Sequence, residues 1–205
     1  MEPFNFTIAY PEPYVPRELT FEIPERIAVD GQIKTPLDEA ETIRILEQLK
    51  TAHIEAIGVC FLWSVINPSH EQRVGELIEK ILPGVPYTLS HRINPSLREY
   101  RRAISTVIDA SLKPIMGAYM RGLEDRLRAA GFSGRVLVIT SQGGVMDAQD
   151  AADAPVNLIN SGPSMAPVAA QAYVAEGKAA TLIVGARGAF RAHAKHGSAN
   201  PFVHT

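Results

Sequence analysis

Residues 54–90, IEAIGVCFLWSVINPSHEQRVGELIEKILPGVPYTLS, contain the pattern that decides the fold class. The stretch begins with a nearly continuous apolar run at 54–62, which is typical of a strand buried on both faces. Asn67-Pro68 then opens a helix, and VPYTLS at 85–90 forms a second strand. A strand, a helix and a strand within roughly 35 residues have the size of one right-handed βαβ unit. The segment therefore predicts an α/β protein with parallel strands.

The residues before this segment predict a hairpin and a helix. Asp30-Gly31 separates two short apolar stretches and supplies the positive φ angles of a tight turn. A helix is expected over 36–50, with Thr35 as its N-cap and Pro36 in its first turn. Its predicted buried face consists of Ala40, Ile43, Leu46 and Leu49.

The residues after it alternate between helix and strand patterns. A long helical stretch covers 96–131, and Pro114 is expected to kink or break it. Further strands are predicted at 135–140, 156–159 and 181–184. The fold class is therefore α/β with a mainly parallel or mixed sheet.

The composition is that of an ordinary globular protein. The chain has 205 residues, a net charge of −2 and a hydrophobic fraction of 46%, so neither nucleic acid nor a membrane is an expected partner. The single cysteine, Cys60, excludes an internal disulfide and fits a reducing compartment. No signal peptide is recognisable, and a cytoplasmic location is the expectation.

Three regions are predicted along the chain. Residues 1–17 form an extended arm rich in proline and aromatic residues, and 18–184 form the α/β region. Residues 185–205 form a basic tail that is expected to be disordered. From Gly177 to the end there is no acidic residue.

Two glycine-containing loops are the candidate phosphate-binding sites. Each follows a predicted strand, where ligands of open α/β sheets bind, and glycine lets the backbone approach an anion. The alternative is that both are tight turns that need glycine for geometry alone. The candidate nucleotide-binding residues are Ser141, Gln142, Gly143 and Gly144 in the first loop and Ser161, Gly162 and Ser164 in the second.

The sequence gives little support for metal binding or for nucleophilic catalysis. No histidine–carboxylate cluster has metal-ligand spacing, so no metal site is predicted. Cys60 lies in an apolar strand and is interpreted as an inert thiol. The charged residues near the start of the long helix are interpreted as a solvated face, the alternatives being an anion site or an interface. They are Arg98, Glu99, Arg101 and Arg102.

Several segments together resemble one family, the hydantoinase A/5-oxoprolinase family. IPERIAVDGQIKTPLDE resembles its hairpin segment, and AIGVCFLWSVINPSHE resembles its strand-loop-helix with Asn67, Pro68, His70 and Glu71. SHRINPSLREYRRAISTVIDASLKP, VITSQGGVM and INSGPS resemble its later segments, with Gln142 where asparagine is usual. The match runs from about residue 10 to 184 and covers the middle of the family sequence.

The resemblance implies an actin-like ATPase (ribonuclease H-like) fold, here incomplete, and a large cytoplasmic enzyme. Such enzymes use ATP and Mg²⁺ to open cyclic amides such as hydantoins or 5-oxoproline, and relatives are subunits of ATP-dependent acetone or acetophenone carboxylases. It also implies a small cyclic-amide substrate and a partner subunit or further domains. In the family, a strand like TLIV precedes an acidic, glycine-rich phosphate loop, whereas here GARGAFRAHAKHG follows.

Three functions therefore remain open. The chain is expected to be a fragment of an ATP-dependent cyclic-amide hydrolase that is inactive in isolation, because both acidic phosphate loops are missing. The first alternative is a ketone carboxylase subunit. The second is a non-catalytic interaction module or the remnant of a broken gene. For the tail, a shift of reading frame after Val184 is favoured over a diverged disordered segment, and no catalytic residue is assigned.

Overall fold

A computed structural model describes residue 7 and residues 12–166, 181–185 and 188–192. The chain divides into two compact units, Met1–Ala110 and Ser111–Thr205. The boundary falls inside the region predicted as one α/β body. The predicted arm lies largely outside the described residues, as do residues 193–205 of the predicted tail.

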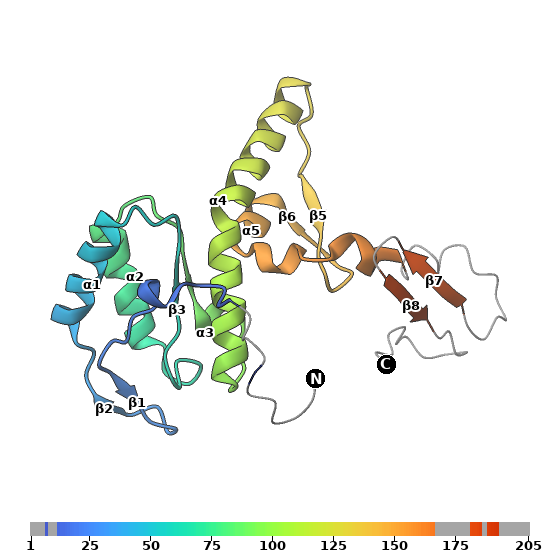
Figure 1. Cartoon of the computed structure of the whole chain (residues 1–205). Helices are drawn as coiled ribbons and strands as arrows, with labels where there is room; N and C mark the ends of the chain where they lie inside the picture. The colour runs from blue at the N-terminus through green and yellow to red at the C-terminus, as the bar shows by residue number, and fades with distance from the viewer. Residues whose placement is uncertain (1–6, 8–11, 167–180, 186–187, 193–205) are drawn as a thin grey trace. The chain divides into compact units, whose positions relative to one another are not determined.

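The first unit contains the predicted βαβ motif (Figure 1). Strands β3 (Ile57–Val59) and β4 (Tyr87–Leu89) pair in parallel, and helix α2 (Ser69–Ile81) connects them. Helix α1 (Glu39–Thr51) precedes β3. The short helices η1 (Arg17–Leu19) and α3 (Ser90–Ile93) belong to the same unit. The parallel pairing inferred from the apolar run is confirmed.

The predicted hairpin is also present. Strands β1 (Arg26–Ile27) and β2 (Ile33–Thr35) pair antiparallel, and Gly31 between them has φ +82°. The Asp30 carboxylate accepts the Gln32 N–H, which stabilises the turn.

Helix α1 begins later than predicted. Thr35 lies in β2, and the Asp38 carboxylate caps the helix by accepting the Glu41 N–H at 2.9 Å. Leu46 and Leu49 of the predicted face are buried, whereas Ala40 and Ile43 are exposed. Thr42 and Ile45 are buried instead, so the predicted face is confirmed in part.

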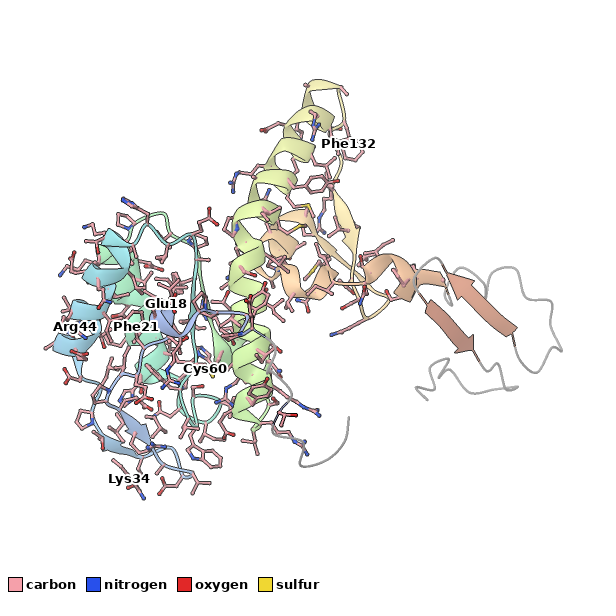
Figure 2. All side chains as sticks on the ribbon, in the orientation of Figure 1. Glu18, Phe21, Lys34, Arg44, Cys60 and Phe132 are labelled. Carbon is pink, nitrogen blue, oxygen red and sulfur yellow. The ribbon has the colours of Figure 1, made fainter. Side chains whose placement is uncertain are left out.

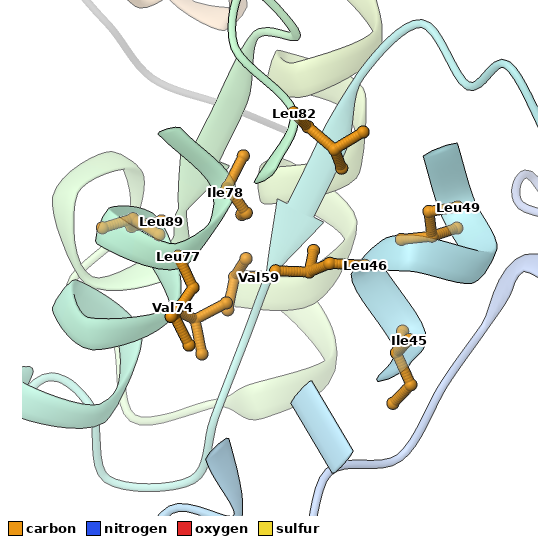
Figure 3. Close-up of a cluster of buried hydrophobic side chains, with 9 residues drawn as sticks. All are labelled: Ile45, Leu46, Leu49, Val59, Val74, Leu77, Ile78, Leu82 and Leu89. Atoms are coloured by element: carbon orange, nitrogen blue, oxygen red, sulfur yellow. The ribbon is translucent and has the colours of Figure 1, made fainter. Parts of the chain in front are cut away.

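The core of the first unit lies between α1, α2 and the parallel strands (Figure 3). Burying a side chain of this size stabilises the folded state by roughly 1.5–3 kcal/mol. The cluster therefore accounts for the association of these four elements. Its members are Ile45, Leu46, Leu49, Val59, Val74, Leu77, Ile78, Leu82 and Leu89.

Helix α4 (Glu99–Ala129) runs through Pro114, so of the two expected effects, a kink or a break, the break does not occur. The boundary between the two units, after Ala110, lies close to this proline. Ala110 is buried in the first unit and Met120 in the second, and this packing on both sides offsets the roughly 3 kcal/mol that an internal proline costs a helix.

The second unit differs most from prediction. Residues expected as a buried strand form the short, largely exposed strand β5 (Leu137–Ile139), which pairs antiparallel with β6 (Val145–Asp147). Helix α5 (Ala148–Asp153) follows. The predicted strand at 156–159 is instead the 3-10 helix η2 (Pro155–Leu158), which has proline at its first position.

Strand β7 (Thr181–Gly185) matches the predicted strand at 181–184. It pairs antiparallel with β8 (Gly188–Ala192), so part of the segment expected to be disordered lies in a strand. The α/β class is thus confirmed, with parallel and antiparallel pairs mixed, and each sheet among the described residues has two strands. No described helix is long and apolar enough to cross a membrane.

Candidate functional site

The first predicted phosphate loop is the turn of the β5–β6 hairpin rather than a strand-to-helix loop. Gly143 has φ +79° and donates its N–H to the Thr140 carbonyl at 3.0 Å. The Thr140 N–H donates to the Gly144 carbonyl, and the Thr140 hydroxyl accepts the Gly144 N–H. Two of the predicted residues therefore shape the turn by using their own backbone groups.

The second predicted loop lies beside the first. Its segment turns at Asn160, which has φ +59°, and residues 161–166 are helical. The Ser164 hydroxyl lies 3.1 Å from the Thr140 carbonyl and 2.7 Å from the Ser161 carbonyl, and both geometries suit donation. The Ser141 N–H donates to the Asn157 carbonyl at 2.6 Å. These contacts bring the two sequence-distant loops together within the second unit.

Only some of the predicted donors face a possible ligand. The N–H groups of Ser141, Gly143, Gly144 and Ser164 donate to protein atoms. Within the described part of the chain, no hydrogen bond uses the N–H groups of Gln142, Ser161 or Gly162. A Cβ added at Gly162 would meet nothing within 4 Å. Among the described residues, these three backbone N–H groups are therefore the predicted donors that no hydrogen bond uses.

The β5–β6 hairpin contains a carboxylate, that of Asp147 at the end of β6. The Gln149 N–H, and after it the Arg135 guanidinium, stabilise the Asp147 carboxylate and hold the pKa of Asp147 below its ordinary value. Among the described residues, no group of three or more His, Cys, Asp or Glu side chains could hold a metal ion. Magnesium, which the family resemblance implies, commonly binds through one or two carboxylates together with substrate phosphates and does not require such a group.

The first unit holds a buried polar cluster that the sequence analysis missed. Glu71 is fully buried, and its Oε1 accepts the Phe61 N–H at 2.9 Å and the Ser90 hydroxyl at 2.5 Å. Its Oε2 lies 3.1 Å from the His91 backbone nitrogen and 2.6 Å from His91 Nδ1. One carboxylate thus holds the loop after β3 against the residues after β4.

Arg102 belongs to this cluster, and its interpretation as part of a solvated face is wrong. Its side chain is 1% exposed. Nε donates to Ser90 Oγ at 3.0 Å, and the two terminal nitrogens donate to the carbonyls of Ser96 and Phe61 at 2.6 and 2.7 Å. Arg101, its neighbour, is exposed as predicted. Charge in the sequence could not distinguish the two, because the partners of Arg102 come from other segments.

Cys60 borders the same cluster and is half-buried (Figure 2). Burial raises the pKa of its thiol, outweighing the hydrogen bond with Ser90 and the charge of Arg102. The side chain is therefore a protonated thiol at neutral pH, in agreement with its interpretation as inert.

A second carboxylate–imidazole pair lies in the same unit. His70 Nδ1 is 2.8 Å from Glu25 Oε2, and both side chains are nearly covered. His70 and Glu71 are adjacent in the sequence but pair with different segments. His70 pairs with the segment before β1, and Glu71 pairs with the segment after β4. The family-like motifs around Asn67 and Arg102 were the only sequence signal for these contacts.

Two family profiles match successive parts of the chain. The profile described as the hydantoinase/oxoprolinase N-terminal region matches residues 1–82, and the hydantoinase/oxoprolinase profile matches residues 102–186. The chain belongs to the hydantoinase/oxoprolinase family. Both loops of the second unit and the arginine of the buried cluster lie within the second match.

Relatives of known name belong to several enzymes of this family. The caprolactamase subunit alpha of Pseudomonas jessenii is 36% identical over 167 residues, which are 80% of this chain and 24% of the relative. The acetophenone carboxylase gamma subunit of Aromatoleum aromaticum is 37% identical over 142 residues, 67% of this chain and 19% of the relative. Both are subunits of larger enzymes by name. This chain spans about a quarter of their length or less.

Solved structures agree with this assignment. The crystal structure of the ATP-dependent caprolactamase from Pseudomonas jessenii matches with a TM-score of 0.79 and 33% identity, covering 91% of this chain and 28% of that one. A nucleotide-free acetone carboxylase matches with a TM-score of 0.71 and 26% identity, covering 82% of this chain and 24% of that one. The hydantoinase/oxoprolinase fold of the chain is therefore shared with enzymes that use ATP.

Proposed function

We propose that this chain is part of an ATP-dependent enzyme that hydrolyses a cyclic amide. The observation that carries the proposal is its likeness to the ATP-dependent caprolactamase, which extends over 91% of this chain. ATP would supply the phosphoryl group that activates an amide oxygen, so that the ring carbonyl becomes a better electrophile. The chain's own contribution is to place nucleotide-facing groups.

The two joined loops of the second unit are the proposed phosphate contact. Gln142, Ser161 and Gly162 offer backbone N–H groups that the protein leaves available, and Gly162 has open space where a Cβ would stand. Ser141, Gly143, Gly144 and Ser164 hold these groups in place through Thr140 and Asn157. Three of the predicted residues would thus contact the phosphate, and the other four would hold those three in position.

The test measures nucleotide binding by the 205-residue chain. Amide resonances are followed by NMR during titration with a non-hydrolysable Mg-ATP analogue, in wild type and in Gly162→Val. The variant should lose at least about tenfold in affinity, because the added side chain occupies the space left for phosphate. Gly122→Val is the matched control, since a Cβ at Gly122 meets only the tip of Arg126.

Two results would overturn the proposal. One is an absence of nucleotide-induced shifts at the loop glycines, which would favour a non-catalytic module. The other is equal affinity in Gly162→Val and Gly122→Val, which would place the nucleotide elsewhere.

A ketone carboxylase subunit is the second candidate, favoured by the 37% identity to the acetophenone carboxylase gamma subunit. Assembly of the chain with the remaining parts of its enzyme distinguishes the two. ATP consumption that depends on a cyclic amide supports the hydrolase, whereas consumption that depends on a ketone and bicarbonate supports the carboxylase.

A further inference from the structure

The buried cluster of the first unit lies where an α/β protein binds ligands. Phe61 is two residues beyond β3, and Ser90 and His91 directly follow β4. These strands are parallel, so their carboxyl ends lie at the same edge. Ligands of open α/β folds bind at that edge. The cluster therefore has the right position for a binding site within the first unit.

The contacts of Glu71 identify it as an ionised carboxylate. Each of its oxygens has two hydrogen-bonding partners. The buried guanidinium of Arg102 has three neutral acceptors, so its charge needs an anion within the same network. Glu71 provides that anion one hydroxyl away, through Ser90. A carboxylate with no proton of its own can only accept from its neighbours.

The contact with Glu71 orients the ring of His91. With Nδ1 donating to Glu71 Oε2, Nε2 is the ring nitrogen left to accept from a ligand. The side chain is 12% exposed. Nε2 has no hydrogen-bond partner among the described residues and is not among their buried unpaired atoms, so it reaches the surface. The cluster thus presents one oriented acceptor.

The loop after β3 contains a residue with a strained backbone. Trp63 has φ +59°, an unfavourable backbone conformation for a bulky side chain. Its neighbour Ser64 lies 3.3 Å from Ser90, oxygen to oxygen, which ties this loop to the residue before His91. Backbone strain of this kind is concentrated at functional sites.

We propose that Nε2 of His91 accepts a hydrogen bond from the ring N–H of a small cyclic amide. The acceptor follows from the geometry, while the substrate class rests on the proposed function. An imidazole whose Nδ1 is held by a buried carboxylate keeps a fixed orientation, which makes its Nε2 a good partner for an amide N–H. His91 is a binding residue in this assignment, and Glu71, Ser90 and Arg102 position it.

The Glu25–His70 pair provides an internal comparison. It has the same chemistry and a similar separation of 2.8 Å, but its carboxylate belongs to the segment before β1 and not to the network that joins the ends of β3 and β4. Amide binding should therefore affect the ring of His91 and leave that of His70 unchanged.

The experiment uses the 205-residue chain with ¹⁵N-labelled histidine. Long-range ¹H–¹⁵N spectra report the tautomer of each ring, and the chain is titrated with ε-caprolactam and then with N-methylcaprolactam, which lacks the N–H. We expect the Nδ1–H tautomer for His91 and an upfield shift of its Nε2 resonance with ε-caprolactam only. His91→Phe should abolish binding, and His70→Gln should retain it.

Three results would overturn the proposal. They are an Nε2–H tautomer at His91, an unchanged Nε2 resonance at saturating millimolar ε-caprolactam, and an equal shift with the N-methylated compound. The nucleotide titration uses different reporters in the second unit. If the wild-type chain binds the nucleotide analogue but His91 does not respond to ε-caprolactam, only this inference is refuted. If the chain does not bind the nucleotide analogue, the proposed function is refuted.

Discussion

Replacing Arg102 by methionine should strongly destabilise the first unit. Methionine keeps the helical preference and much of the length of the side chain but removes the charge. The change removes the cation nearest to the buried Glu71 in this network. It also leaves the carbonyls of Phe61 and Ser96 without their hydrogen-bond donor. Each buried acceptor left without a donor costs about 1–3 kcal/mol, so the two carbonyls together cost about 2–6 kcal/mol. This magnitude is comparable to a large part of the stability of an ordinary domain.

Urea denaturation measures the effect. Trp63 is the single tryptophan and lies in the same unit as Arg102, so its fluorescence reports the unfolding of that unit. With an m-value of about 2 kcal/mol per M, the midpoint should fall by about 2 M. Arg101→Met is the matched control because Arg101 is adjacent and exposed, and it should change the free energy of unfolding by less than about 0.5 kcal/mol.

A double variant distinguishes charge compensation from packing. In Glu71→Gln/Arg102→Met the stranded anion is absent, so the total cost should be smaller than the sum of the two single changes. If Arg102→Met is within about 0.5 kcal/mol of Arg101→Met, the reasoning about buried charge fails. Additive single effects would likewise show that Glu71 and Arg102 do not compensate each other.

Two further predictions concern the second unit and are followed by circular dichroism. Gly143→Ala should lower the free energy of unfolding by about 1–2 kcal/mol because φ at this position is +79°. Gly144→Ala should be nearly neutral because the new Cβ meets only Thr140 Oγ1 at 3.6 Å. Equal costs for the two variants would contradict the turn geometry. The pKa of Asp147 is lowered in the folded state by the Gln149 N–H and then by Arg135. Its stabilisation is therefore present above the unfolded pKa of about 3.9 and is lost as the pH falls through the folded value. Wild type should lose stability more steeply in acid than Asp147→Asn, and parallel pH profiles would count against this assignment.

The sequence was informative where structure depends on neighbouring residues. Asp30-Gly31 predicted the hairpin because only a few residue types adopt a positive φ at low cost. The apolar run ending near Cys60, followed by Asn67-Pro68, predicted the βαβ unit because strand and helix signals alternated at the right spacing. The family resemblance, which the profile matches confirmed, came from the same local motifs.

The sequence was misleading where contacts between distant residues determine the local structure. Thr35 and Asp38 are both good N-caps, and only the pairing of Thr35 with Arg26 across the hairpin assigns the cap to Asp38. SQGG resembles a loop between a strand and a helix until its flanking residues pair with each other as β5 and β6. In both cases the competing local preferences were of similar strength, so tertiary pairing selected between them.

By itself, the sequence determined the α/β class, the hairpin, the parallel strand–helix–strand unit and the family. Only the tertiary structure showed that Arg102 is buried, that Ser90 joins it to the buried Glu71, and that the ring of His91 is partly exposed. The physical reason is the length scale of each interaction. Turn and helix signals act over a few residues, whereas the burial of Arg102 depends on partners that are 6, 12 and 41 residues away in the chain.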